Sequence, residues 1–558
     1  MRRLGRWLPL AAVVAGAAAL RLWGLTQGLP NVNTRPDERE LLEHTARFAA
    51  GDLNPRWFVY PNFYFYLVWA WEQALLAARR LWLPTPAWPE MLTQAMPTAI
   101  LYGRLLSALA GTATVALVYA AGRRLGGRAL GLLAALLLAA NFLHVRDSHV
   151  LKDEILLPVG VLASLWTLAR WVERPGPGRA VLAGLAIGLA TALMYSGILL
   201  VAPAYLAAVL ASPRRGLARL LPHTQLALVG LAAALAFLAT CPFLLLDFEN
   251  TRSTAAFATA VIYGTPPEAR PGPTAGWVDG ARLYLASRAY GYHLAVSLRH
   301  GCGLLAALAA PVAVVFAWRA PRRPFLVLSA AFLVFYYLAI GSSRVHFARF
   351  VTPVTPLLAL LVARLVLAVA ERATRQWALV AAGFAVALAG EPLAKSIAYD
   401  RIASRTDTRV LATRWMAEHL PAGAVVAQLG SGVFGIADPD LPPAVRKAPL
   451  RLGETDLAQH GVTHVVTHSH QLPYSQPNAA LLQRLGPQLR LLAEFTPYRD
   501  GPAGRFEAED AYYVPIAGFC GVERPGPLVR VYAYSGGPHD DDPRLPEGSG
   551  QLRERRSR

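Results

Sequence analysis

The strongest constraint on the fold is a series of apolar segments, each long enough to cross a lipid bilayer. A helix needs about 20 residues to span about 30 Å of hydrocarbon, and about eleven segments meet this length. They lie near residues 7–27, 100–122, 128–145, 154–172, 179–195, 196–212, 224–246, 301–319, 324–341, 350–370 and 376–393. The hydrophobic fraction of 54% and the charged fraction of 16% also exclude one soluble domain. The sequence therefore predicts a mainly α, multi-pass membrane protein.

Arginine residues indicate which connections face the cytoplasm. They cluster on every second connection, and cytoplasmic loops carry an excess of Lys and Arg. The clusters are Arg2, Arg3 and Arg6; Arg123, Arg124 and Arg128; Arg170, Arg174 and Arg179; Arg214, Arg215 and Arg219; Arg319, Arg322 and Arg323; Arg372 and Arg375. This distribution explains the net charge of +19 and argues against nucleic acid as a partner. Connections 28–99, 146–153, 195–197, 247–300 and 342–349, and the chain after about 394, are predicted to lie outside the cytoplasmic (inner) membrane.

Two alternatives concern the ends of this topology. The first six residues and the apolar run after them also resemble a cleavable signal peptide, but the run continues through Leu22, which favours a retained first span. Residues 61–82 follow a proline start and are rich in Tyr and Trp, which prefer headgroup depth. We expect a juxtamembrane helix there, because a twelfth span would break the charge alternation. The three cysteines match neither a disulfide framework nor a zinc site.

The character of the chain changes near residue 400. A helical pattern over 408–419 is followed by β-rich runs at 424–429, 462–467, 489–495, 511–516 and 528–534, which predict a soluble α/β domain. The tail from Gly536 is rich in Gly, Pro, Asp and Arg and is expected to be disordered. We therefore expect a transmembrane domain at 1–395, an extracytoplasmic domain at 396–535 and a tail at 536–558. A proline-rich loop at 265–277 could close over a groove.

The first outer loop carries a cluster of carboxylates. Asp37, Glu38, Glu40 and Glu43 follow Pro36, which is typical of the first position of a helix. A carboxylate beside a polar groove can act as general base on a hydroxyl group. The alternative is that these residues only stabilise a helix N-terminus, at about 0.3–1 kcal/mol each, and this is the preferred interpretation for Glu40.

The second outer connection packs ionisable residues between two apolar segments. Arg146, His149 and Asp153 recur at helical spacing, and Asp147 lies between the first two. Ionisable groups this close to hydrocarbon are costly unless they are paired or used, so we predict a second polar site here. A collar of snorkelling charges is the alternative. Asp37, His149 and Asp153 could also bind a divalent metal ion, although no fixed-spacing motif supports this.

The connection at 342–349 carries Arg344, His346 and Arg349 ahead of Pro353 and Pro356. An outward pair of arginines runs against the charge bias of the other loops. Guanidinium groups stay charged and bind phosphate oxygens bidentately, so at the outer headgroup level they suit a phosphate group. The alternative is a plain anchor to lipid headgroups.

The order and sidedness of these motifs resemble the GT-C membrane glycosyltransferases. The residues that carry the resemblance are Arg35-Pro-Asp37-Glu38, Asn54-Pro55, Tyr60-Pro61 with the aromatic helix after it, Arg146-Asp-Ser-His149 with Asp153, and the 344–356 stretch. More narrowly, residues 1–395 resemble the bacterial relatives of protein O-mannosyltransferases and of lipid A aminoarabinose transferases, in glycosyltransferase family 39. Members often carry a Lys-Tyr pair where this chain has Met194-Tyr195.

The resemblance implies a polyprenyl-phosphate sugar as donor and an acidic residue of the first outer loop as base. It gives Asp37 the base role, with Glu38 and Asp153 as further catalytic candidates. Arg344, His346 and Arg349 would then bind the donor phosphate, and Arg146, Asp147 and His149 would form the second polar site. Tyr60 and Tyr195 are expected to line the groove. No cofactor other than the divalent metal ion is indicated.

We therefore expect a glycosyltransferase that moves a sugar to a hydroxyl acceptor on the outer face of a bacterial-type cytoplasmic membrane, in contact with membrane lipids. A transporter or flippase of lipid-linked sugars would also need polar groups at a membrane groove, but the chain shows no two matching halves. A membrane-anchored binding protein, with 396–535 as the binding domain, is a further alternative. That alternative predicts that function survives a change at Asp37.

Overall fold

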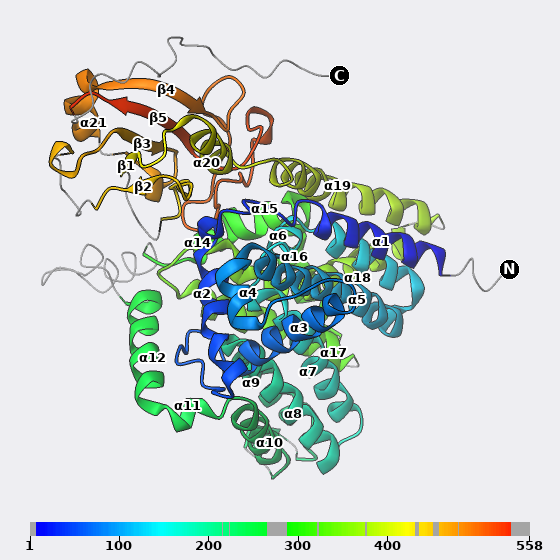
Figure 1. Cartoon of the computed structure of the whole chain (residues 1–558). Helices are drawn as coiled ribbons and strands as arrows, with labels where there is room; N and C mark the ends of the chain where they lie inside the picture. Colours follow the sequence, from blue (N-terminus) through cyan, green and yellow to red (C-terminus); the bar gives the residue numbers. More distant parts are fainter. Residues whose placement is uncertain are drawn as a thin grey trace, which may run out of the picture. The chain divides into compact units, whose positions relative to one another are not determined.

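The computed structural model describes residues 7–214, 216–221, 224–264, 287–320, 323–373, 376–429, 435–449, 457–477 and 479–536. The chain divides into two compact units (Figure 1). The first contains residues 1–25 and 37–400, and the second contains residues 26–36 and 401–558. The second unit therefore combines the C-terminal part of the chain with a short piece of the first outer loop. Residues 265–277, where a closing loop is predicted, and the tail from 537 lie outside the described residues.

The first unit is a bundle of apolar helices (Figure 1). Its helices are α1 (Leu8–Leu22), α2 (Pro36–His44), α3 (Asn62–Arg80), α4 (Trp88–Gln94), α5 (Met96–Ala140), α6 (Phe142–Asp147), α7 (Leu157–Glu173), α8 (Pro177–Leu193), α9 (Val201–Ala211), α10 (Thr224–Thr240), α11 (Phe243–Leu246), α12 (Phe248–Tyr263), α14 (Tyr290–Tyr292), α15 (Arg299–Gly301), α16 (Leu304–Trp318), α17 (Pro324–Gly341), α18 (Thr355–Ala373) and α19 (Trp377–Ala403). Two of these, α2 and α19, cross a boundary between the units, because Pro36 and residues 401–403 belong to the second.

Six helical stretches of the described residues are long and apolar enough to cross a membrane, and a bent pair could add a seventh. They are Met96–Ala140, Asp153–Glu173, Gly216–Thr240, Pro324–Gly341, Ala348–Arg372 and Trp377–His419, and the bent pair joins Tyr290–Gly301 to Leu304–Trp318 at 117°. Shorter apolar helices cover Leu8–Leu22, Pro177–Leu193 and Tyr195–Ala211. The apolar segments of the sequence all fall on these helices, which confirms a multi-pass helical membrane protein. The number of about eleven crossings stays a prediction.

Glycines allow the helices of the bundle to fold back and pack closely. In α5 the helical path breaks at Gly126 and Gly127, and Gly127 has a left-handed φ of 86°, which favours glycine. A Cβ atom at Gly131 would lie 2.6 Å from the carbonyl oxygen of Tyr119, so the two halves of α5 touch backbone to backbone. Between α8 and α10, a Cβ at Gly188 would lie 2.3 Å from the Ala233 carbonyl oxygen. Small residues at such contacts are typical of helix packing in membranes.

Helix α3 does not belong to the apolar stretches that could span a membrane. Pro61 precedes the helix and has an extended backbone, and the first helical residue is Asn62. Its aromatic side chains pack on the outer loop, where Phe65 lies 6.2 Å from the ring of Trp57 and Phe48 lies 5.9 Å from Trp69. The helix expected at 61–82 is therefore present, and its interfacial position stays a prediction.

The second unit is built on a five-stranded sheet. Its elements are α20 (Thr408–His419), β1 (Val425–Leu429), β2 (Arg446–Lys447), β3 (His464–Ser469), α21 (Ala479–Leu485), β4 (Leu489–Phe495) and β5 (Leu528–Tyr534). The strand order is β2-β1-β3-β5-β4, in which β2, β1 and β3 are parallel and β5 and β4 are antiparallel to their neighbours. The inner residues of α20 and of β1, β3 and β5, such as Met416, Val426, Val466 and Val529, form a buried core. The predicted α/β class is confirmed.

The strand predicted at 511–516 is wrong. The strand β2 was not predicted, because its two residues are too few to show a periodic pattern. Residues 511–516 form turns instead. Tyr512 and Tyr513 have left-handed φ values of 44° and 67°, which interrupt an extended strand. The apolar composition of this run reflects burial of Tyr513 and Ile516 and not sheet pairing.

Buried histidines on and after β3 predict acid sensitivity of the second unit. Burial lowers the pKa of His464 and His468 to about 4 and that of His470 to about 3, whereas an unfolded histidine titrates near pH 6.5. The folded state therefore binds fewer protons than the unfolded state, and stability falls as the pH drops from about 6.5 toward about 4. Hydrogen exchange of β3 in the full chain, corrected for its intrinsic pH dependence, should accelerate between pH 7 and pH 4.5. Unchanged protection over this range would contradict the prediction.

Candidate functional site

Asp37 forms an ion pair with a lysine of the second outer connection. The Asp37 carboxylate, on the first turn of α2, accepts a hydrogen bond through Oδ2 from Lys152 Nζ. The Asp37 side chain is 35% exposed, whereas that of Lys152 is 9% exposed. The carboxylate is thus open to a solute on one side and held by a buried cation on the other. The catalytic role expected of this carboxylate stays a prediction.

Lys152 is itself fixed by Tyr60. Its Nζ atom donates to the Tyr60 hydroxyl at 2.6 Å and lies 5.3 Å from the centre of the ring. Burial alone would lower the pKa of Lys152, but the facing carboxylate of Asp37 and the Tyr60 hydroxyl raise it, and the net pKa lies well above the usual value. Lys152 therefore stays charged. Burial likewise raises the pKa of Tyr60, which stays neutral as a hydrogen-bonding group.

Tyr195 contacts Tyr60 through the backbone. The Tyr195 hydroxyl donates to the Tyr60 carbonyl oxygen at 3.3 Å, and its ring lies 6.5 Å from that of Phe237. The structure therefore brings together the two tyrosines predicted to line a groove. Met194, which precedes Tyr195, is apolar, and Lys152 of the second outer connection donates to the Tyr60 side chain of this pair.

Glu38 points into the bundle, opposite to its neighbour Asp37. It is fully buried, and Arg104 of α5 binds both of its oxygens at 2.6–3.1 Å. Its Oε1 also accepts from the backbone N–H of Leu151 at 2.8 Å. Because both oxygens are occupied inside the protein, the geometry does not support the catalytic role predicted for Glu38. The residue instead ties α2 to α5 and to the residue before Lys152.

The second outer connection is not continuously helical, which corrects the prediction of one shared face. Helix α6 ends at Asp147, and a 3₁₀ turn begins only at Asp153. Arg146 Nε donates to Asp147 at 2.8 Å, and Asp147 accepts from the hydroxyl of Thr352. Helical spacing therefore does not relate Arg146 to Asp153, because the residues between them form a turn and an extended piece.

His149 and Asp153 lie in separate surroundings. The ring nitrogens of His149 face the carbonyl oxygens of Val145 at 2.9 Å and Trp23 at 2.8 Å, and its Nε2 lies 3.4 Å from Asp400. Asp153 is 4% exposed and adjoins Glu154. Among the residues that the structure describes, no three His, Cys, Asp or Glu side chains are placed to hold a metal ion. The metal set predicted from Asp37, His149 and Asp153 is therefore not assembled.

The arginine-rich connection provides one firmly held cation. Arg349 Nε donates to Glu154 at 2.9 Å, and its guanidinium lies 4.1 Å from the ring centre of Phe347. His346 packs its ring on Tyr292 at 5.2 Å. The side chain of Arg344 is exposed, and its backbone N–H donates to the Ile262 carbonyl oxygen at 2.7 Å.

Three contacts of this site were not predicted from the sequence: Lys152 on Asp37, Arg104 on Glu38 and Glu154 on Arg349. Lys152 and Glu154 belong to the ionisable residues of the second outer connection. The helical spacing expected there instead points to Arg146, His149 and Asp153. Arg104 carried a clearer signal, because an arginine inside an apolar segment requires a partner. That partner is an acidic residue of the preceding loop.

Sequence comparison relates part of the bundle to one family of membrane glycosyltransferases. Residues 91–239 match the family described as dolichyl-phosphate-mannose-protein mannosyltransferase. Comparison with curated protein sequences finds no match.

One solved structure extends the comparison to the fold. ArnT from Cupriavidus metallidurans, bound to undecaprenyl phosphate, aligns over 94% of this chain and 97% of its own, with 16% identity and a TM-score of 0.50. The archaeal oligosaccharyltransferase AglB from Archaeoglobus fulgidus, in complex with an inhibitory peptide and a dolichol-phosphate, aligns over 84% of this chain and 70% of its own, with 14% identity and a TM-score of 0.49. The predicted resemblance to GT-C enzymes is confirmed by the family match together with the shared fold of ArnT.

Proposed function

We propose that the protein is a glycosyltransferase that moves a sugar from a polyprenyl-phosphate carrier to a hydroxyl acceptor. The observation that carries this proposal is the partly exposed carboxylate of Asp37, held by buried Lys152 in a bundle of the GT-C type. The description of the matching family names a dolichyl-phosphate sugar, and the ArnT structure holds undecaprenyl phosphate. Both support a polyprenyl-phosphate donor here. The Arg clusters support a site on the outer face of the cytoplasmic membrane.

The proposed reaction is a single displacement. Asp37 removes the acceptor proton while the acceptor oxygen forms a bond to the anomeric carbon, and the bond from that carbon to the phosphate oxygen breaks. The electron pair of the broken bond leaves on the phosphate. As Asp37 takes the proton it loses its negative charge, and Lys152 becomes available to stabilise the charge that develops on the leaving group. Such stabilisation by preorganised groups is usually the largest contribution to catalysis.

Arg349, with Arg344 and His346 on the same connection, is proposed to bind the donor phosphate. A partly buried guanidinium suits this role, because it remains charged and presents its donors in a fixed plane. Arg349 is held by Glu154 and by the ring of Phe347, so its orientation is set before the donor arrives. Asp153 precedes Glu154 in the sequence and is the second candidate for the base.

Arg349→Ala is expected to raise KM for the donor by about tenfold or more, because a hydrogen bond to a charged group contributes about 1.5–3 kcal/mol. Arg349→Lys should recover only part of this loss. Because the alanine variant leaves Glu154 without its partner, Glu154→Gln/Arg349→Ala should be measured beside it. Donor saturation at the wild-type concentration in both variants would remove Arg349 from the donor site.

The experiment that tests the function uses the purified full chain in lipid nanodiscs. Synthetic polyprenyl-phosphate sugars are supplied with peptide, lipid and glycan acceptors, and products are identified by mass spectrometry. Transfer to a hydroxyl acceptor supports the proposal. In parallel, liposomes report movement of the carrier across the bilayer. Movement without any transfer product would favour the flippase alternative and contradict the proposal.

A further inference from the structure

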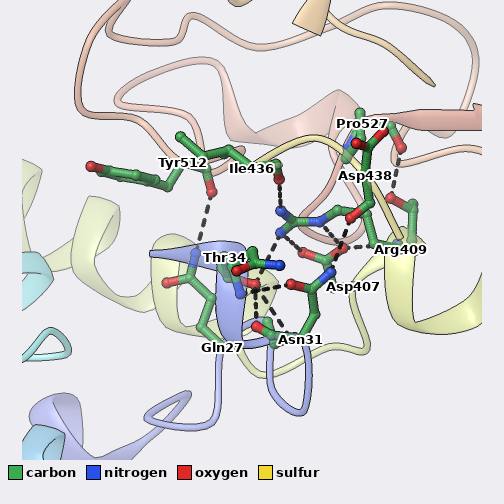
Figure 2. Close-up of polar contacts among 12 residues, drawn as sticks. Gln27, Asn31, Thr34, Asp407, Arg409, Ile436, Asp438, Tyr512 and Pro527 are labelled. Carbon is green, nitrogen blue, oxygen red and sulfur yellow. Dashed lines mark hydrogen bonds and ion pairs between the residues drawn. The ribbon is translucent and has the colours of Figure 1, made fainter. Parts of the chain in front are cut away.

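A short piece of the first outer loop folds with the C-terminal part of the chain. Residues 26–36, here called the strap, belong to the second unit, whereas Leu25 and Asp37 on either side belong to the first. The strap continues directly into α2, whose first residue is Pro36 and whose second is Asp37. Figure 2 shows polar side chains of the strap in contact with residues from the C-terminal part of the chain.

The central contact is made by Arg409, at the start of α20. Its side chain is fully buried, and its Nε and Nη2 bind both carboxylate oxygens of Asp407 at 2.8 and 2.6 Å (Figure 2). Nη1 donates to the carbonyl oxygen of Ile436, and Nη2 also donates to the Thr34 hydroxyl at 3.3 Å. A buried guanidinium with its counter-ion is rigid, so it offers the strap a fixed point of attachment.

Other contacts secure the strap along its length. Asn31 Nδ2 donates to the Asp438 carbonyl oxygen at 3.1 Å, and Gln27 Nε2 donates to the Tyr512 carbonyl oxygen at 3.5 Å (Figure 2). The Arg35 guanidinium lies 4.3 Å from the centre of the Tyr512 ring. Tyr512 holds a left-handed φ of 44°, which is strained for a residue other than glycine. Such strain is maintained by surrounding structure and occurs preferentially at functional positions.

The strap also holds its own shape. The Thr34 hydroxyl donates to the Asn31 carbonyl oxygen at 2.9 Å, and Asn31 Oδ1 accepts from the Asn33 backbone N–H at 3.0 Å. Gly28 has a φ of 75°, and a Cβ there would lie 2.4 Å from the Thr34 side chain. Thr34 is therefore the residue at which the internal bonds of the strap meet its attachment to Arg409.

In the first unit, Arg104 binds one residue before the strap and one residue after it. Its Nη1 donates to the carbonyl oxygen of Leu25, the last residue before the strap, at 2.9 Å. The same guanidinium binds Glu38, which is the second residue after the strap. Asp37 therefore follows directly on a segment of the second unit, and residues before and after that segment are held by Arg104 in the first unit.

We propose that the second unit positions the base, and that Arg409 and Thr34 are positioning residues that act on Asp37 through the strap. This inference rests on the proposed function, in which Asp37 takes the acceptor proton. Neither residue needs to touch the substrate. A shift of the strap changes the orientation of the first turn of α2, and small errors in the placement of a catalytic group reduce turnover strongly.

The first test replaces Thr34 with valine, which keeps the shape of the side chain and removes the hydroxyl. We expect kcat at saturating donor and acceptor to fall about fivefold to tenfold, with both KM values within about twofold of the wild type. Thr34→Ser, which restores the hydroxyl, should recover kcat. The matched control is Thr463→Val. Thr463 lies in the same unit, and its hydroxyl accepts from the Val425 backbone N–H at 3.1 Å without bonding to the strap or to Arg409. This control should leave kcat unchanged.

The second test combines each strap variant with Asp37→Asn. If Thr34 acts through Asp37, its replacement has no further effect on the residual rate of Asp37→Asn. Asn31→Ala, which removes the bond to Asp438, is the second strap variant if Thr34→Val does not yield folded protein. Two results would overturn the inference while Asp37→Asn itself showed its expected loss. One is a wild-type kcat for folded strap variants. The other is a strap variant that lowers the rate of Asp37→Asn as strongly as it lowers the rate of the wild type. Near-normal transfer by Asp37→Asn alone would overturn the base assignment itself.

Discussion

Replacing Asp37 with asparagine is expected to reduce sugar transfer by about 10² to 10⁴ fold, the usual contribution of a general base. Asparagine keeps the size of the side chain and can still accept a hydrogen bond from Lys152. It cannot take up the proton of the acceptor. The loss should appear in kcat more than in either KM, and should be measured by mass spectrometry of the transfer product. Asp37→Glu keeps the carboxylate at a changed position and should retain part of the activity.

The matched control is Glu43→Gln on the same helix. Glu43 is an exposed carboxylate that pairs with Arg39 at 2.7 Å, one turn away, so its replacement removes a charge from α2 without touching Lys152. It should transfer sugar at nearly the wild-type rate. Near-normal transfer by Asp37→Asn would remove Asp37 as base and make Asp153 the first candidate. Equal losses in Asp37→Asn and Glu43→Gln would indicate a general effect of charge on α2 and would also contradict the base role.

The fold was predictable where it depends on long patterns. Apolar segments of about 20 residues and alternating strands are local signals, because the membrane and the sheet core each impose one environment along a whole element. This is why the helices of the bundle and the strands β1, β3, β4 and β5 were located correctly. The run at 511–516 has the same composition, but the left-handed Tyr512 and Tyr513 cannot extend a strand, and no local pattern announces their conformation.

The candidate site was predictable only in part, because it depends on contacts between distant segments. The sequence pointed to Asp37 and Tyr60 as members of a polar groove, and the structure places both on Lys152. It could not show that Glu38, one residue after Asp37, faces Arg104 in the interior. Neighbours on a helix point about 100° apart, so one can face solvent while the other is buried. Which one is buried depends on where Arg104 lies.

The attachment of the strap to the second unit lies beyond what the sequence can indicate. Thr34 and Arg409 are separated by most of the chain, and the helical pattern that includes Arg409 gives no sign of its partner. Polar residues near a helix start, such as Asn31 and Thr34, normally indicate a turn or a cap. Here their side chains also bond to Asp438 and Arg409 of the second unit, which a local interpretation does not predict.

The second large effect is expected at the buried pair of Arg104 and Glu38. The two side chains are 2% and 1% exposed, and the guanidinium binds the carboxylate through two nitrogens. Arg104→Met removes the cation and leaves a buried carboxylate without its counter-charge. Breaking a buried pair in this way costs about 3–5 kcal/mol, which is a large part of the stability of a typical domain. The free energy of unfolding should be measured by denaturant titration in detergent micelles.

The double variant Arg104→Met/Glu38→Gln separates the loss of the pair from the loss of shape. Glutamine carries no charge and keeps an oxygen for the Leu151 N–H, so the double variant should be more stable than Arg104→Met alone. The exposed pair of Arg39 and Glu43 provides the comparison, because breaking it should cost less than about 1 kcal/mol. If Arg104→Met and Arg39→Met lowered stability equally, Arg104 would not be the residue that holds α2 in place. The orientation of Asp37 would then depend on Lys152 and the strap alone.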